Sequence, residues 1–235
     1  MHNEKLSLFA LGDSAMVIQF NNVISLDVNE RVMMLYDKLK SLELPHIKDI
    51  VPAFSSLTIH YDISLIKNEA GNDLTFFEIL SKEVKQIIEK ESIIRIEKYN
   101  KIKVPVCFNE KFAPDLNEIS TKANLSRNKI IDIYLSKTYR VFMIGFLPGF
   151  PYMGEVDERI VMPRKMQPRN FVHSGSVGIA GKQTGIYPFN SPGGWQIIGR
   201  TPVKLFDKNS SSPSFFKPGD EVEFYSINEN EFANY

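Results

Sequence analysis

Residues 175–207 read GSVGIAGKQTGIYPFNSPGGWQIIGRTPVKLFD, and this stretch indicates how the second half of the chain folds. Its apolar runs, such as SVGIA and WQIIG, are short, and glycine or proline interrupts each one before a helical period can develop. Such runs are typical of short strands joined by tight turns. The same pattern extends from VFMIGF at residues 141–146 to VEFYSI at residues 222–227. It predicts a barrel or a sandwich of many short strands.

A different pattern occupies the first part of the chain. Alternating apolar residues predict strands at SLFALG, AMVIQF, IKDIVPAF and SLTIHYD. Between the two pairs, apolar residues spaced three and four apart predict a helix that is capped by Asp27 and ends before Pro45. A second helix is expected from about Asp73, followed by a strand at IIRIEKY. We therefore predict an α+β fold with two domains, a small α+β sandwich over residues 1–99 and a β-barrel over residues 100–235.

A pair of helices is expected near the start of the second domain, within residues 115–140. Asp115 and Ser126 stand where each helix would begin, and both residue types are good helix caps. The spacing also resembles a helix-turn-helix, but the second helix carries few basic side chains to contact DNA phosphates. We therefore predict a plain helical hairpin and no nucleic-acid partner.

The overall composition excludes several classes of protein. The chain has 235 residues, with 28 Lys and Arg against 28 Asp and Glu, so its formal net charge is zero. Its single cysteine, Cys107, excludes an intramolecular disulfide, and its first residues lack the order of a signal peptide. No apolar run approaches the roughly 20 residues that a membrane span needs. We expect a reduced, cytoplasmic protein without a membrane partner.

The charges are nevertheless placed unevenly. Residues 159–206, here called the acid-free segment, contain seven Lys and Arg and no Asp or Glu. Ten of the thirteen glycines lie between residues 145 and 199, which overlap this segment. The segment is either the solvated basic face of a loop-rich β-domain or a surface that binds anions.

Several standard motifs are absent. The stretch GSVGIAGKQTG resembles a phosphate loop, but five residues separate Gly175 from Gly181 and Gln183 follows Lys182, so it is not a Walker A motif. The four histidines are scattered singly and only one cysteine is present, so no metal site is predicted. Cys107 lies in an apolar strand pattern and is expected to be a buried small hydrophobe.

Three groups of residues in this region are candidates for function. The candidate catalytic residues are cationic donors for carboxylate or phosphate oxygens: Arg164, Arg169, Arg200 and Lys182. Glycine-rich turns could form nests of backbone amides for an anion, and the candidate substrate-binding residues there are Gly175, Ser176, Gly178, Gly181, Gln183, Tyr187, Ser191, Gly193 and Gly194. The candidate partner-binding residues form a rigid aromatic surface: Phe146, Pro148, Phe150, Tyr152 and Trp195.

Long strings of this sequence resemble one known family, that of the 5-oxoprolinase B subunits, also called the allophanate hydrolase subunit 1 or sporulation-kinase-inhibitor family. The strings are YRVFMIGFLPGFPYMGEVDERIVMPRK, GSVGIAGKQTGIYP, SPGGWQIIGRTPVKLFD and PVCFNEKFAPDL, with weaker matches at LGDSAMVIQF and VPAFSSLTIHYD. The resemblance implies an N-terminal α+β domain and a C-terminal cyclophilin-like β-barrel domain.

The resemblance also implies a function. It implies one subunit of an ATP-dependent 5-oxoprolinase, which converts 5-oxo-L-proline to L-glutamate together with a second barrel-type subunit, similar to the C subunits of such enzymes, and a separate component similar to their A subunits. ATP with Mg²⁺ is the expected cofactor. Because the acid-free segment has no carboxylate, we expect the general base, and the metal ligands, to come from partner subunits, so that the chain alone is inactive.

Two other functions are open from the same resemblance. One is inhibition of a sporulation-type histidine kinase, with the aromatic surface as the docking face. The other, weaker one is a role as a carboxyltransferase-like or allophanate-hydrolase-like subunit.

Overall fold

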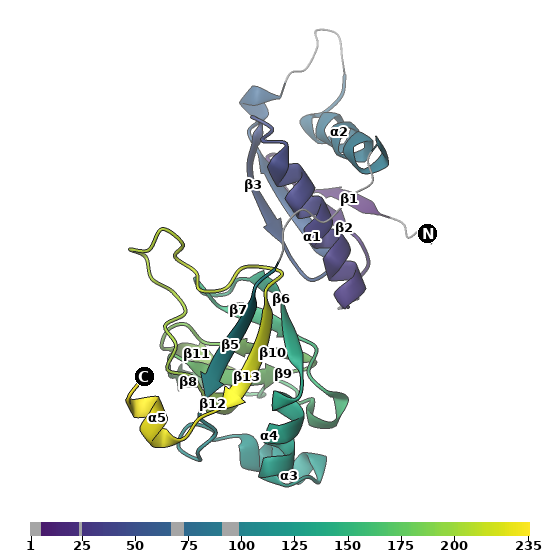
Figure 1. Cartoon of the computed structure of the whole chain (residues 1–235). Coiled ribbons are helices and arrows are strands. Elements are labelled where there is room, and N and C mark those ends of the chain that lie inside the picture. Colours follow the sequence, from purple (N-terminus) through teal and green to yellow (C-terminus); the bar gives the residue numbers. More distant parts are fainter. Residues whose placement is uncertain (1–5, 24, 67–72, 91–98) are drawn as a thin grey trace. The chain divides into compact units, whose positions relative to one another are not determined.

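The computed structural model describes residues 6–23, 25–66, 73–90 and 99–235 (Figure 1). The chain divides into two compact units, Met1–Lys98 and Tyr99–Tyr235. Among the described residues, no helix is both long enough and apolar enough to cross a membrane.

The first unit is an antiparallel sheet with helices. Its strands lie in the order β1-β2-β4-β3, and helix α1 contacts β3 and β4. The elements are β1 (Ser7–Ala10), β2 (Ala15–Gln19), α1 (Leu26–Ser41), β3 (Ile47–Pro52), β4 (Ser56–Tyr61), the short 3₁₀ helix η1 (Ile63–Leu65) and α2 (Phe76–Lys90). The four strands that the alternating pattern predicts in this unit are thus confirmed. The predicted strand IIRIEKY lies, except for its last residue, outside the described residues.

Both helix starts differ from the prediction. Helix α1 is capped by Ser25, whose hydroxyl accepts a hydrogen bond of 3.2 Å from the amide of Val28, so the predicted cap at Asp27 is wrong. Asp27 lies in the first turn instead, where its negative charge interacts favourably with the positive end of the helix dipole. Helix α2 begins at Phe76, after Thr75 and Glu78 exchange capping hydrogen bonds.

The second unit contains a seven-stranded sheet in the order β12-β9-β10-β7-β6-β13-β5 and a two-stranded sheet of β8 and β11. Its strands are β5 (Lys101–Val106), β6 (Thr138–Ile144), β7 (Pro151–Gly154), β8 (Arg169–Val172), β9 (Ser176–Ala180), β10 (Gln183–Ile186), β11 (Ser191–Gly193), β12 (Gln196–Arg200) and β13 (Glu221–Ser226). Its helices are α3 (Leu116–Ala123), α4 (Arg127–Leu135), the 3₁₀ helix η2 (Glu158–Ile160) and α5 (Glu229–Ala233).

The large sheet curls until its two outer strands meet. Cys107 follows β5 directly and exchanges two backbone hydrogen bonds, of 2.8 and 3.0 Å, with Arg200 at the end of β12. The architecture is therefore mixed α+β with a curled, half-barrel sheet, consistent with the expected cyclophilin-like fold. Cys107 is buried, as its apolar surroundings in the sequence predict.

Helices α3 and α4 form the predicted hairpin beside this sheet (Figure 1). Ser126 caps α4, as predicted, by accepting a hydrogen bond of 3.2 Å from the amide of Lys129. The inner side chains of both helices join the main core of the unit, among them Leu116, Ile119 and Ile130. Phe150, Tyr187, Trp195 and neighbouring apolar residues form a second, separate buried cluster of this unit.

Candidate functional site

The acid-free segment receives a counter-charge from Asp115, which precedes helix α3. The predicted capping role of this side chain is wrong, because it makes no hydrogen bond to the helix. One carboxylate oxygen accepts a 2.6 Å hydrogen bond from the amide of Ile197, and the other lies 2.9 Å from Lys165 Nζ and 2.5 Å from Arg169 Nη2. The Asp115 side chain is only 3% exposed. One buried negative charge is therefore shared between two cations of the segment.

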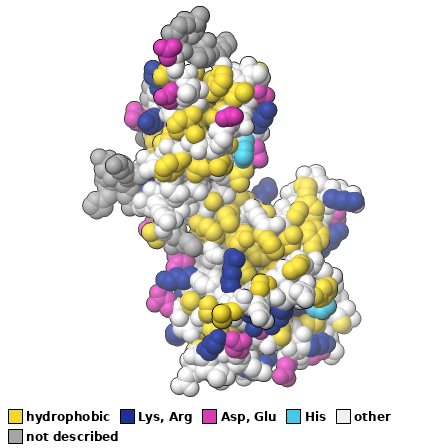
Figure 2. All heavy atoms as spheres, turned by 180° about the vertical axis from the view of Figure 1, so that it is seen from behind, with side chains coloured by type: hydrophobic (Ala, Val, Ile, Leu, Met, Phe, Trp, Pro, Cys, Tyr) yellow, Lys and Arg dark blue, Asp and Glu magenta, His cyan; other side chains and the backbone are white. Residues whose placement is uncertain are grey.

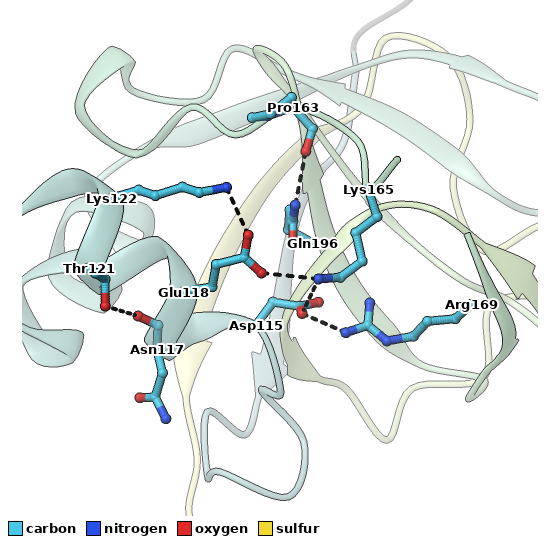
Figure 3. Close-up of polar contacts among 9 residues, drawn as sticks. All are labelled: Asp115, Asn117, Glu118, Thr121, Lys122, Pro163, Lys165, Arg169 and Gln196. Carbon is cyan, nitrogen blue, oxygen red and sulfur yellow. Dashed lines mark hydrogen bonds and ion pairs between the residues drawn. The ribbon is translucent and has the colours of Figure 1, made fainter. Parts of the chain in front are cut away.

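Glu118, in the first turn of α3, is a second carboxylate in this cluster (Figure 3). Its oxygens lie 2.8 Å from Lys122 Nζ and 3.2 Å from Lys165 Nζ. The hydrogen bonds from Lys122 and then Lys165 lower the pKa of Glu118. The segment is thus free of acids in sequence but not in space, because α3 brings two carboxylates to it. The sequence did not predict that Asp115 and Glu118 pair with cations of this segment, although Asp115 lies within the motif PVCFNEKFAPDL.

Seven of the candidate residues line one hollow, here called the aromatic pocket. Its volume is about 240 Å³. Its lining residues are Phe146, Tyr152, Arg164, Pro168, Tyr187, Pro192, Gly193, Gly194 and Trp195. The structure therefore brings together residues that the sequence assigned to three different roles: a cationic donor, glycine-rich turns and aromatic side chains.

The aromatic pocket combines one cation with neutral polar and apolar walls. The Arg164 guanidinium carbon lies 5.8 Å from the ring centroid of Trp195, within the range of a cation–π contact. Burial raises the pKa of Tyr152 and of Tyr187, so both hydroxyls stay protonated at neutral pH. Among the described residues, no Asp or Glu lines this pocket. It can hold a small anion with an apolar or cyclic part, but it offers no general base of its own.

A second hollow, here called the cationic pocket, is lined by the other two candidate arginines, Arg169 and Arg200. Its volume is about 250 Å³. It is lined by Lys111, Phe112, Pro114, Arg169, Phe171, Val172, His173, Ser176, Ile197 and Arg200. The two pockets share no lining residue, although Pro168 lines one and Arg169 lines the other.

Lys182 lies in neither pocket. It occupies the turn between β9 and β10, where its ammonium pairs with Glu158 at 3.0 Å and both side chains are exposed. This ion pair raises the pKa of Lys182. The geometry does not bring Lys182 together with Arg164, Arg169 or Arg200 around one ligand.

The glycine-rich stretch before and after Lys182 is a β-hairpin and not an open loop. The amides of Gly175 and Gly181 donate to the carbonyls of Tyr187 and Met162, both at 2.7 Å. Ser176, Gly178 and Gln183 pair within the β9–β10 ladder or with its neighbours. The expected nest of free amides is therefore not formed here, because these donors already bond within the barrel. Ser191 begins β11, and its buried hydroxyl has no hydrogen-bond partner among the described residues.

The expected aromatic docking surface is also only partly exposed. Phe150 and Trp195 are 1% and 5% exposed, so these two residues are core and pocket-wall residues and not free anchors. Phe146 is 61% exposed and has a φ of 65°, Pro148 is exposed and Tyr152 is half-buried. Hydrophobic side chains still cover a broad area on one face of this unit, with Lys and Arg side chains beside them (Figure 2).

Comparison with known proteins defines the family. The sequence matches the family described as carboxyltransferase domain, subdomain C and D, over residues 6–216. The chain belongs to this carboxyltransferase-domain family. Among its relatives, the B subunit of the 5-oxoprolinase of Bacillus subtilis (strain 168) is 38% identical over 96% of this chain and 94% of its own length. The resemblance to 5-oxoprolinase B subunits is thus confirmed.

Solved structures also resemble this chain. A conserved uncharacterized protein from Pyrococcus horikoshii is 38% identical, covers 96% of this chain and 100% of its own, and has a TM-score of 0.55. The urea amidolyase of K. lactis has a TM-score of 0.76 and covers 97% of this chain but 15% of its own. Its identity is 21%, so this likeness is one of fold alone.

Proposed function

We propose that this chain is one of the subunits of an ATP-dependent 5-oxoprolinase, which converts 5-oxo-L-proline to L-glutamate. The observation that carries the proposal is the 38% identity to a 5-oxoprolinase B subunit across nearly the whole of both chains. This relative is named as one subunit of its enzyme, which implies partner subunits. We therefore include in the proposal a second barrel-type subunit and a separate third component.

The aromatic pocket suits the proposed substrate. 5-Oxoproline is a five-membered lactam that carries one carboxylate. The Arg164 guanidinium would pair with that carboxylate, and the ring would lie against Trp195. The protonated hydroxyl of Tyr152 or Tyr187 would donate to the lactam oxygen.

The remaining chemistry is assigned to partners. Opening the lactam would begin with transfer of the γ-phosphoryl group of ATP to the amide oxygen, which would release ADP. Water would then add to the same carbon, and the ring C–N bond would break to give the amino group of glutamate. A second water would release the phosphate. These steps need a base and a metal-bound nucleotide. Among the described residues, no group of three or more His, Cys, Asp or Glu could hold a metal ion. The buried carboxylate that this chain offers beside the acid-free segment, Asp115, is already bonded to Ile197, Lys165 and Arg169. We therefore propose that partner subunits supply the base and most ligands of Mg²⁺–ATP.

Reconstitution tests the proposal. The chain should be purified alone and together with its two candidate partner subunits, and ATP-dependent release of glutamate from 5-oxoproline should be measured. We expect turnover only from the assembly. Full turnover by the chain alone would contradict the shared active site, and no turnover by the correctly formed assembly would contradict the function.

Carboxyl transfer is a second candidate, favoured by the description of the matched family as a carboxyltransferase domain. It predicts that the assembly transfers a carboxyl group from carboxybiotin to an amide such as urea. The same assembly should be assayed with both substrates, because a preference for urea and carboxybiotin would favour this candidate over 5-oxoprolinase.

A further inference from the structure

We propose that the cationic pocket is a second ligand site of the barrel, separate from the aromatic pocket, and that it binds a phosphate group. The proposal adds to the proposed function, since ATP would be one source of such a group. It does not depend on turnover, because phosphate binding can be measured on the chain alone.

The charges around the cationic pocket favour an anion. Lys111, Arg169 and Arg200 line it, and among the described residues no Asp or Glu does. Lys111 pairs with Glu229 and Arg169 pairs with Asp115, while Arg200 forms no ion pair within the described part of the chain. The pocket therefore has excess positive charge, and the carboxylates that offset part of it are outside its lining.

Arg200 is held in an orientation that leaves donors available. Its Nε donates a 2.8 Å hydrogen bond to the carbonyl of Ser174, and the rings of Phe112 and Phe232 lie 5.8 and 5.7 Å from the guanidinium carbon. Within the described residues, neither terminal nitrogen of Arg200 makes a hydrogen bond. A fixed guanidinium with free N–H groups can bind two oxygens of one anion at little cost in side-chain entropy. Burial lowers the pKa of Arg200, which is consistent with a charge that lacks a counter-ion.

Phosphate fits this pocket better than a larger ligand does. The volume of about 250 Å³ is below the ~300–1,000 Å³ of pockets that enclose drug-sized molecules. Arg200 supplies a positive charge without a carboxylate partner, and Lys111 and Arg169, whose partners Glu229 and Asp115 lie outside the lining, add N–H donors. Such a set suits a phosphate group, which carries about 1.5 to 2 negative charges at neutral pH. The aromatic wall, where Phe171 is 53% exposed and its ring lies 4.7 Å from that of His173, can contact the organic part of a phosphate ester.

Binding to the full chain tests the inference. Inorganic phosphate and ATP would be titrated separately into the wild type by calorimetry, with ³¹P NMR as a second readout. In Arg200→Gln we expect affinity for phosphate to fall at least about tenfold, since a charge-assisted hydrogen bond is lost. Lys111→Gln should weaken binding in the same direction. The control Lys204→Gln should bind as the wild type does, because Lys204 is exposed, pairs with Asp207 and lines neither pocket.

Each outcome has a defined meaning. Binding of phosphate but not of ATP would support a site for free phosphate or a small ester, and tighter binding of ATP would support a nucleotide. If neither phosphate nor ATP binds, the inference is overturned. Unchanged affinity in both Arg200→Gln and Lys111→Gln would also overturn it. Lys111→Gln loses an exposed ion pair with Glu229 and a cation–π contact with Phe112, so it tests the site even where Arg200→Gln fails to fold. A negative result here would leave the glutamate-release assay unaffected, so the two proposals can fail separately.

Discussion

The carboxylate of Asp115 accepts a 2.6 Å hydrogen bond from the amide of Ile197, a residue 82 positions further along the chain. The amide of Asp115 donates in return to the carbonyl of Ile197 at 3.0 Å. The second carboxylate oxygen holds Lys165 and Arg169. One buried side chain thus connects the start of α3 with strand β12 and with two cations of the acid-free segment, Lys165 and Arg169.

Asp115→Asn should therefore destabilise the barrel. The amide side chain can still accept the bond from Ile197, but the negative charge beside Lys165 and Arg169 is lost. Arg169 then loses its ion pair with Asp115, and Lys165 keeps its contact with Glu118. Loss of one partner from a buried ion pair costs about 3–5 kcal/mol. Because Lys165 and Arg169 are 21% and 29% exposed, solvent screens part of this cost, and we expect a smaller loss of about 2–3 kcal/mol. Urea unfolding, followed by circular dichroism, measures the loss.

Glu118→Gln is the matched control for this prediction. Glu118 also contacts Lys165, but its side chain is 41% exposed, and exposed ion pairs contribute less than about 1 kcal/mol. If both variants lost the same stability, the special role of the buried Asp115 would be wrong.

Two adjacent glycines of the aromatic pocket should respond differently to substitution. In Gly193→Ala the new Cβ would lie 2.4 Å from the Tyr187 hydroxyl, whereas in Gly194→Ala the nearest atom, Pro168 Cγ, is 3.6 Å away. Gly193→Ala must displace the buried Tyr187 and should cost about 1–3 kcal/mol, while Gly194→Ala should stay within about 0.5 kcal/mol. Thermal unfolding of the two variants provides the comparison, and binding of 5-oxoproline should weaken only in Gly193→Ala. Equal behaviour of the two would contradict this account of the pocket wall.

Local signals predicted most of the fold. The strands of both units follow short apolar runs, and Ser126 caps its helix because capping depends on residues three positions apart. Ser25 and Asp27 are both acceptable caps by residue type, so the sequence pattern alone did not distinguish them.

The candidate site was harder to predict because its contacts are distant in sequence. Asp115 has the sequence features of a helix cap, and its true partners become visible only when β12 lies beside α3. The exposure of Phe150 and Trp195 was overestimated for a similar reason, since aromatic residues between glycines fit a surface and a tightly packed cluster equally well. Sequence reasoning found most of the lining of the aromatic pocket, but not its separation from the cationic pocket.

The stability of the first unit should depend on the charge of Asp62. Its carboxylate accepts hydrogen bonds from the hydroxyl and amide of Ser64 and lies 3.0 Å from Lys48 Nζ, and these contacts lower its pKa to about 2. Because the pKa in the folded state lies below the unfolded value of about 3.9, the charged form stabilises the fold above that value. This contribution is lost as the pH falls through about 4 towards 2.

The comparison of the wild type with Asp62→Asn measures this effect. The variant keeps an acceptor for Ser64 but loses the charge that faces Lys48. The wild type should melt at a higher temperature at neutral pH, and the difference should shrink as the pH approaches 2. A difference that does not change with pH would show that the charge is not responsible.

Turnover by the reconstituted assembly should separate Arg164 from Lys182. Arg164 lines the aromatic pocket beside Trp195, so Arg164→Gln removes the cation proposed to hold the substrate carboxylate. We expect kcat/KM for 5-oxoproline to fall by about tenfold to a hundredfold, mainly through KM, since this contact exists before and during the reaction.

Lys182→Gln is the matched control, with the same change in charge on an exposed turn outside both pockets. Loss of its surface ion pair with Glu158 should leave kcat/KM within about twofold of the wild type. Steady-state release of glutamate, with ATP in excess, measures both variants under the same conditions. A large loss in Lys182→Gln with little change in Arg164→Gln would move the substrate from the aromatic pocket to the β9–β10 turn.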